Sequence, residues 1–165
     1  MQDNTEETFY PNGKIRSRIY FNATGEYHRN PDEGPAIEGW FENGQRHYQY
    51  YYVDGELHRD SVEGPALEAW DSNGQKIYKH YLVHGQSHRD PSKGPSFEYW
   101  GSDGKKYFEE YYVDGKEVPK PEVDREIKND NKTNRRVLFK WKYKVSKLFK
   151  RCREFAQRFK PRAGL

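Results

Sequence analysis

The chain of 165 residues is poor in the residue types that build most compact cores and many reactive sites. It has one cysteine, Cys152, and one methionine, so an intramolecular disulfide and a four-cysteine metal site are excluded. Ile, Leu, Val and Met together number 20, no apolar run approaches the length of a membrane span, and the mean hydropathy is -1.30. The first residues lack the basic and then apolar pattern of a signal peptide, which favours a cytoplasmic location.

Aromatic side chains take the place of the missing aliphatic ones. Tyr, Phe and Trp together number 27 and outnumber the aliphatic residues. Such rings bury a large area while a polar tip stays in water. The composition therefore predicts a thin folded structure with two wet faces, although the low hydropathy alone would suggest disorder.

A set of residues returns at a fixed interval of 30 positions. The motif Gly-x-x-His-Arg begins at Gly25, Gly55 and Gly85, and each copy is followed by a Gly-Pro pair, a glutamate and a tryptophan. These glutamates and tryptophans are Glu38, Glu68, Glu98, Trp40, Trp70 and Trp100. A residue needed for one chemical step occurs once, whereas a residue present in every unit usually builds the contact between units. The period therefore predicts a repeat architecture with a scaffolding role for the recurring residues.

Two turn signals divide each unit into strands. Asn43-Gly44 and Asp54-Gly55, with their equivalents in later units, favour the left-handed backbone of two-residue hairpin turns. The tyrosine-rich segments 48–53, 77–83 and 107–113 predict strands with rings on both faces. We expect a mainly β fold, an elongated antiparallel β-meander of repeats, over residues 9–118. One extra residue between Gly13 and Gly25 predicts a bulge or a longer turn near Asn22.

The segments outside the repeats differ in composition. Residues 1–8 are expected to be disordered and 119–134 to form a polar linker, whereas 135–165 form a basic arm with 12 Lys or Arg and one acid. Apolar residues spaced three and four apart predict an amphipathic helix in the arm: Leu138, Trp141, Val145, Leu148, Cys152, Phe155 and Phe159. Residues 137–145 also alternate lysine with apolar residues, so an edge strand is an alternative there.

The recurring histidines and arginines are the candidates for catalysis or metal binding. His58-Arg59-Asp60 matches the catalytic triplet of protein kinases, but the glycine loop, strand lysine and Asp-Phe-Gly of that family are missing. Histidines one repeat apart lie about 10 Å or more from each other, too far to share a metal ion. We predict no enzyme activity, metal site or cofactor; each histidine caps or stacks in the ladder, and each arginine pairs with a carboxylate such as the in-phase glutamate. His47, His80 and His84 are out of phase and are expected at exposed positions.

Charge is divided unevenly along the chain. Residues 135–165 carry a net +11 and the remainder -8. An exposed apolar helix face favours aggregation, so the arm is expected to dock on its own acidic sheet, an anionic membrane, another protein's groove or nucleic acid. The candidate residues for an anionic partner are Lys140, Lys142, Lys144, Lys147, Lys150, Arg151, Arg153 and Arg158. The candidates for a protein-binding surface are Trp40, Trp70, Trp100, Tyr51, Tyr81 and Tyr111.

The pattern Tyr-Tyr-Val-Asp-Gly-x-x-His-Arg-Asp with Gly-Pro-Ala at residues 51–66, followed by Trp-Asp-Ser-Asn-Gly at 70–74, resembles the MORN-like β-hairpin repeats. The likeness is greatest to the variant found in bacterial antitoxin-like proteins and in large-virus and phage proteins, and it covers about residues 9–118. It implies an elongated single-layer sheet that binds proteins or lipids without catalysis. We predict a non-enzymatic protein-binding module, with neutralisation of a toxin or host-defence factor as the hypothesis. The alternative is a nucleic-acid or membrane-surface binder that acts through residues 135–165.

Overall fold

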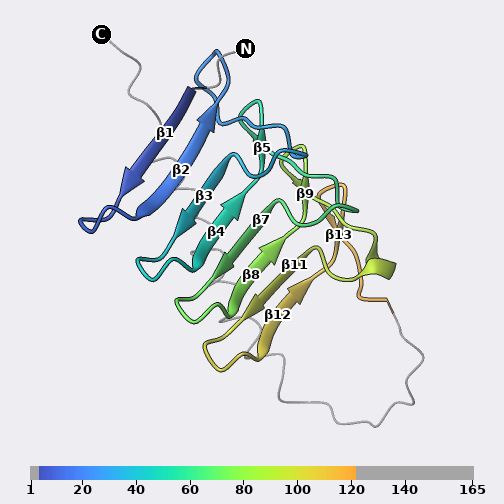
Figure 1. Cartoon of the computed structure of the whole chain (residues 1–165). Coiled ribbons are helices and arrows are strands. Elements are labelled where there is room, and N and C mark those ends of the chain that lie inside the picture. Colours follow the sequence, from blue (N-terminus) through green and yellow to red (C-terminus); the bar gives the residue numbers. More distant parts are fainter. Residues whose placement is uncertain (1–3, 122–165) are drawn as a thin grey trace. The chain divides into compact units, whose positions relative to one another are not determined.

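The computed structural model describes residues 4–121, which form a mainly β structure (Figure 1). Eight strands make one antiparallel sheet in the order β1-β2-β3-β4-β7-β8-β11-β12, so the predicted meander is confirmed. The strands are β1 Asn4–Phe9, β2 Ile15–Phe21, β3 Ile37–Trp40, β4 Arg46–Tyr50, β7 Leu67–Trp70, β8 Lys76–His80, β11 Phe97–Trp100 and β12 Lys106–Glu110. The predicted helix of the basic arm and the segment 137–145 lie outside the described residues, as does most of the predicted linker.

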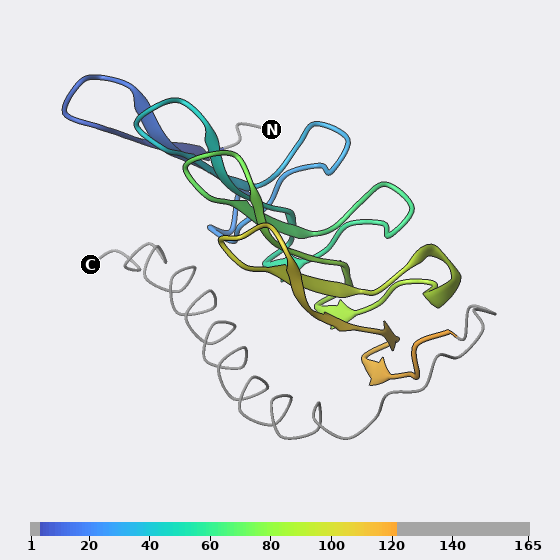
Figure 2. The same ribbon diagram turned by 90° about the horizontal axis from the view of Figure 1, so that it is seen from below.

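Three short hairpins form a row beside the main sheet (Figures 1 and 2). They are β5 Tyr52–Val53 with β6 Glu56–Leu57, β9 Leu82–Val83 with β10 Gln86–Ser87, and β13 Tyr112–Val113 with β14 Lys116–Glu117. Neighbouring hairpins bond through the backbone: the N–H of Gly85 donates to the carbonyl of Leu57 (2.8 Å), and the N–H of Arg59 donates to that of Leu82 (3.1 Å). Each unit is therefore joined to the next twice, once in the main sheet and once in this row.

The tyrosine-rich segments are not the continuous strands that their alternation predicts. Each is divided at Tyr51, Tyr81 or Tyr111, where the chain leaves the main sheet and enters a short hairpin. The backbone of Tyr51 shows the reason: its N–H donates across the main sheet to Ala66 (2.8 Å), and its carbonyl accepts from His58 in the hairpin connection (3.0 Å). A residue that serves two ladders forms a corner, so the alternation of faces does not carry through it.

The two turn signals of each unit give different turns. In the short hairpins both central residues are left-handed, as at Asp54 (φ 46°) and Gly55 (φ 79°), so these are the predicted two-residue turns. In the long hairpins only the glycine has positive φ; Phe41 N–H donates to Gln45, and Gly44 N–H donates to Phe41 (both 2.8 Å). That pattern is a three-residue loop with a register shift beside Trp40, so the two-residue prediction is wrong there.

The N-terminal part of the sheet differs from the prediction at one place and agrees at another. The expected disorder of residues 1–8 is wrong for residues 4–8, because β1 pairs with β2 from Asn4↔Phe21 onward while all six of its side chains stay exposed. Backbone pairing orders this polar strand against the edge of β2, together with the contacts of Thr8 with Ser17 and of Glu7 with Arg18 (2.6 Å each). The predicted longer turn near Asn22 is confirmed, since the N–H of Asn22 donates to the carbonyl of Glu26 (2.9 Å).

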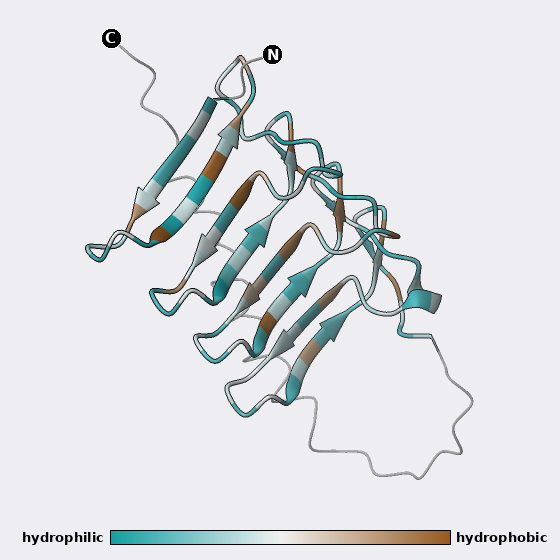
Figure 3. Ribbon diagram, in the orientation of Figure 1, coloured by the Kyte–Doolittle hydropathy of each residue, from teal (hydrophilic) through white to brown (hydrophobic). Residues whose placement is uncertain are grey.

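The register of the main sheet aligns side chains in rows that cross all units. One face, called the apolar face, carries two such rows: Ser17, Gly39, Tyr48, Ala69, Tyr78, Tyr99 and Phe108, and Ile19, Ile37, Tyr50, Leu67, His80, Phe97 and Glu110. Rings touch along and between the rows, as in the hydrogen bond of 2.9 Å between the hydroxyls of Tyr50 and Tyr78. Figure 3 shows that hydrophobic residues recur at the start of β3, β7 and β11. The rows make the core continuous across units.

His80, in the second of these rows, differs most from its predicted exposure. The expected exposed position is wrong, because its side chain is buried at 5% exposure, lies edge-on to Phe97 and shares a hydrogen bond of 2.7 Å between its Nε2 and Ser87 Oγ. Tyr50 fills the equivalent place one unit earlier. Burial lowers the pKa of His80 from 6.5 to about 3, since a charged imidazole is poorly solvated there.

This buried imidazole predicts a specific loss of stability in mild acid. The unfolded chain takes up a proton at His80 below pH 6.5, whereas the folded chain does so only near pH 3, so stability is lost as the pH falls through that interval. Between pH 7 and pH 5 the free energy of unfolding should fall by about 2 kcal/mol more in the natural chain than in a His80→Tyr variant. Urea unfolding at the two pH values measures the difference, and the other histidines cancel. Parallel pH profiles for the two proteins would contradict the prediction.

Candidate functional site

The recurring histidines stand one per unit and join each unit to the turn of the next. The Nδ1 atoms of His28, His58 and His88 face the backbone N–H groups of Asp54, His84 and Asp114 at 3.1, 3.1 and 3.2 Å. Each of these histidines contacts a different turn, and they do not gather around a common site, which agrees with their predicted capping role. They therefore order the left-handed turns between units.

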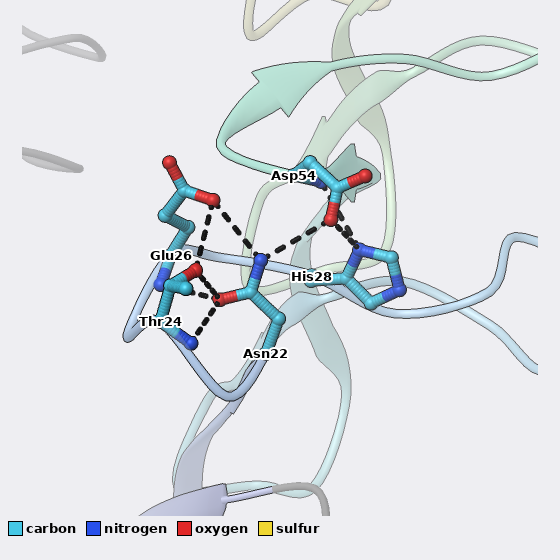
Figure 4. Close-up of polar contacts among 5 residues, drawn as sticks. All are labelled: Asn22, Thr24, Glu26, His28 and Asp54. Atoms are coloured by element: carbon cyan, nitrogen blue, oxygen red, sulfur yellow. Dashed lines mark hydrogen bonds and ion pairs between the residues drawn. The ribbon is translucent and has the colours of Figure 1, made fainter. Parts of the chain in front are cut away.

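The first such junction has additional polar contacts (Figure 4). Asn22 Nδ2 donates to Asp54 Oδ1 at 3.1 Å, and His28 Nδ1 lies 2.9 Å from the same oxygen. Asn22 Oδ1 accepts the N–H groups of Thr24 (3.1 Å) and Glu26 (2.9 Å), which closes the longer first turn. The second junction pairs two rings instead, because His84 stands where Asp54 would: the rings of His58 and His84 are 4.3 Å apart. Burial, followed by the neighbouring His84, lowers the pKa of His58.

The recurring arginines stack on tyrosine rings, and this partner was not predicted. The Cζ atoms of Arg29, Arg59 and Arg89 lie 4.1, 4.1 and 4.0 Å from the ring centres of Tyr20, Tyr51 and Tyr81. Each Nη1 also donates to a proline carbonyl, that of Pro35, Pro65 or Pro95 (3.3, 3.5 and 3.0 Å). The predicted pairing with a glutamate holds only for Arg29, whose Nη1 is 4.0 Å from Glu38; within residues 4–121, Arg59 and Arg89 form no ion pair. A half-buried planar guanidinium is held by a ring and a carbonyl here.

The tyrosines proposed for a protein-binding surface are not on the surface. Tyr51, Tyr81 and Tyr111 have 7, 7 and 9% exposure, so this part of the predicted site is wrong. They occupy the corners between the two ladders, and an arginine covers two of the three rings. The alternation of residues along a strand could not predict this burial. The corner interrupts the strand, and the covering arginine lies several residues further along the chain.

The tryptophans form a row of partly exposed rings near the loops of the long hairpins. Trp40, Trp70 and Trp100 are each paired in register with a basic residue, namely Arg46, Lys76 and Lys106. Cations also lie over the rings: Arg18 over Trp40 (5.8 Å), Lys76 over Trp70 (5.5 Å), and Lys79 and Lys106 over Trp100 (5.8 Å each). We call these three residues the tryptophan row. Of the residues predicted for a protein-binding surface, these three tryptophans are the ones whose rings are partly exposed in every unit.

Beside the tryptophan row runs a ladder of acids and bases on the same face, called the charged face. Its cross-strand order is Glu7, Arg18, Glu38, Gln49, Glu68, Lys79, Glu98 and Glu109. Glu38 and Glu98 are buried, and ammonium groups of Lys79 and Lys106 contact the Glu98 carboxylate. Burial, and then the cations of Arg89, Lys76 and Lys106, lower the pKa of Lys79 to about 8 despite that contact. These pairs depend on strand register, and no signal in the sequence identifies them.

Among residues 4–121 no group of three or more His, Cys, Asp or Glu side chains is placed to hold a metal ion. In the same part of the chain no helix has the length and apolar character needed to cross a membrane. The residues proposed for an anionic partner, Lys140 to Arg158, lie outside the described residues.

Comparison with known proteins yields no family model, no curated protein and no solved structure that matches the chain.

Proposed function

We propose that this protein is a non-enzymatic protein-binding repeat module whose partner binds across the tryptophan row. The observation that carries the proposal is the repetition of a partly exposed tryptophan, with a cation beside it, at the same place in three units that are joined by backbone hydrogen bonds. Tryptophan and arginine are the residue types most enriched among the strongest contributors to protein interfaces. Rings held on a hydrogen-bonded sheet lose little conformational entropy when a partner covers them.

The other recurring residues support a scaffolding role. His58 contacts the next turn, Arg59 stacks on Tyr51, and Glu98 is neutralised by lysines, so each is committed to a contact within the array. A repeat whose recurring polar residues hold the units together leaves its exposed rings for recognition. Under this proposal the protein acts in the cytoplasm without a cofactor.

The finer proposal is that the module is an inhibitor related to the MORN-like, antitoxin-type repeats, which neutralises a toxin or a host-defence factor. The support is the repeat motif together with the antiparallel hairpin array. In this proposal the basic residues of 135–165 add a contact to an anionic part of the partner. The second candidate function is binding of nucleic acid or an anionic membrane surface through that arm, which its 12 Lys or Arg and single acid favour.

A comparison of three variants of the full chain separates these functions. Trp70→Ala removes the central ring of the row, Val62→Ala removes an apolar side chain that is 88% exposed outside the row, and Lys140→Gln with Lys142→Gln and Lys144→Gln neutralises part of the arm. Partner proteins cross-linked to the natural chain in cells are identified first, and the affinity of each variant for the purified partner is then measured.

We expect Trp70→Ala to weaken partner binding about thirtyfold, since truncation of a central ring costs about 2 kcal/mol or more. Val62→Ala should bind like the natural chain, and circular dichroism should show that all three variants are folded. Equal affinity of Trp70→Ala and Val62→Ala would refute the tryptophan row as the binding surface. Salt-sensitive binding to RNA or anionic vesicles that the lysine variant alone loses would favour the second function.

A further inference from the structure

The two edge strands of the main sheet differ in what they offer to another chain. β1 is exposed along its whole length. Its Glu6 lies on the apolar face, at the end of the row that continues through Ile19 and Ile37. A charged, two-sided polar strand is a common protection against further strand addition. At the other end, β12 keeps Phe108 buried on the apolar face and continues into the buried Tyr111. The two ends of the sheet are therefore not equivalent.

The earlier units bind the next strand of the main sheet through a backbone N–H group that has an equivalent at the end of β12. The N–H groups of Tyr20, Tyr51 and Tyr81 donate to Ala36, Ala66 and Ser96 of the following unit at 2.8, 2.8 and 2.7 Å. Tyr111 is the fourth tyrosine of this series, and no described strand follows β12 to accept its N–H. Because hydrogen-bonded positions of an antiparallel ladder recur at every second residue, the backbone of Glu109 faces the same edge.

The row of short hairpins lacks one donor at the same end. In the earlier units the N–H of Arg29, Arg59 or Arg89 donates to the next hairpin at 3.1, 3.1 and 3.0 Å. The equivalent residue after β14 is Pro119, which has no N–H to donate. One of the two backbone bonds that join neighbouring hairpins is therefore missing at this end, whereas the main sheet keeps the N–H group that would join it to one more strand.

Charge at this edge selects the kind of strand. Across the earlier unit boundaries a neutral or cationic residue meets an acid, as in Gln49↔Glu68 and Lys79↔Glu98. Glu109 occupies the place of Gln49 and Lys79, next to Glu98, and Lys106 and Lys120 reach its carboxylate from the side, at 3.2 and 2.6 Å. A second copy that docked by β12 or β1 would bring glutamates against glutamates, which is unfavourable.

We propose that the outer edge of β12 binds an extended segment of a partner protein whose cationic residues alternate with aromatic or aliphatic ones. The partner strand would accept the N–H of Glu109 and Tyr111, place a cation opposite Glu109 on the charged face, and pack apolar side chains beside Phe108 on the other face. This mode, strand addition to a sheet edge, takes affinity from the backbone and specificity from alternate side chains. The edge adjoins the last tryptophan, since Lys106 contacts both Trp100 and Glu109, but it would bind by strand addition and not through the rings, so the proposal goes beyond the function proposed above.

The test uses the full chain and two capped heptapeptides of equal composition. In the first, Val-Lys-Phe-Lys-Tyr-Lys-Val, lysines alternate with apolar residues. In the second, Val-Phe-Tyr-Val-Lys-Lys-Lys, the lysines form one block. We expect the alternating peptide to slow hydrogen exchange of the Glu109 and Tyr111 amides about tenfold or more, and the block peptide to leave it unchanged. Equal binding of the two peptides, or slowed exchange in β1 instead of β12, would overturn the proposal.

Matched charge variants at the two edges complete the test. Glu109→Lys should weaken binding of the alternating peptide about tenfold, whereas Glu7→Lys, at the equivalent end of the charged ladder on β1, should not change it. Glu109→Gln restores the residue type of Gln49, serves as the variant least disturbing to the fold, and should show a smaller loss in the same direction. Slow exchange of the Glu109 and Tyr111 amides before any peptide is added would refute the proposal and assign the edge to a second copy or to this chain itself. Trp70→Ala should bind the peptide normally, so failure here leaves the function of the tryptophan row to its own test.

Discussion

Replacement of Gly64 by alanine is expected to lower the free energy of unfolding by about 4 kcal/mol, the sum of backbone strain and a side-chain clash. Gly64 has φ 145°, a conformation that residues with a Cβ rarely adopt. A Cβ here would lie 2.8 Å from Nη1 and 3.1 Å from Cζ of Arg59. That guanidinium cannot move aside freely, because it stacks on Tyr51 and donates to Pro65. Urea unfolding of the full chain, followed by circular dichroism, measures the loss.

Gly44→Ala is the matched control for this substitution. Gly44 also has a positive φ, 87°, but a Cβ there would meet no atom within 4 Å, so only backbone strain of about 1 kcal/mol is expected. Combining Gly64→Ala with Arg59→Ala should cost less than the sum of the two single changes, because the clash disappears with the guanidinium. Equal losses for Gly64→Ala and Gly44→Ala, or strict additivity in the double variant, would show that the clash does not exist.

Arg89→Ala is expected to destabilise the chain by about 3 kcal/mol, since it removes a shielded cation–π contact and a charged hydrogen-bond donor. The Cζ of Arg89 lies 4.0 Å from the centre of the Tyr81 ring, and its Nη1 donates to the Pro95 carbonyl at 3.0 Å, the shortest such bond of the three units. The change also uncovers Tyr81 at the corner between the two ladders. Thermal and urea unfolding give the loss.

Two controls separate geometry from charge at this site. Arg89→Lys keeps the charge but has no planar group that can stack on the ring and reach the carbonyl together, so we expect about two-thirds of the loss. Lys93→Ala removes an exposed cation of the same connector and should change stability by less than about 0.5 kcal/mol. A lysine at position 89 that restored full stability would contradict the stacking role and favour a simple charge effect.

The sequence was most informative where the structure depends on local turn chemistry. Asp54-Gly55 predicts a two-residue turn, and both residues are left-handed because those types accept that conformation without help from distant contacts. Asn43-Gly44 predicts the same turn but closes a three-residue loop, since the register shift beside Trp40 adds a residue. Residues 1–8 look disordered by composition, yet β1 exists because β2 offers it an edge. Local signals therefore identify the hairpins, while their loop lengths and end strands depend on the neighbouring strand.

The candidate site was predictable only in part for a similar reason. The tryptophans are placed in a row because a residue that recurs with the repeat must recur in space once the units stack in register. The tyrosines of the predicted surface recur equally, but each lies at a corner between the two ladders and is buried, and Arg59 and Arg89 cover two of the three rings. His80 is out of phase with the other histidines in sequence and is nevertheless buried, because it takes the place of Tyr50.

The sequence alone predicts a stack of 30-residue hairpin units held together by recurring histidine, arginine and aromatic residues. The period can be read directly from the sequence, and turn chemistry acts over a few residues, so neither depends on knowing which strands pair. Tertiary structure alone decided which rings are covered, which acid meets which lysine, and that β12 rather than β1 has a buried ring at the sheet's edge. Those outcomes depend on register and on corners, where residues about 30 positions apart come within contact distance, and a shift of one residue would reverse every face.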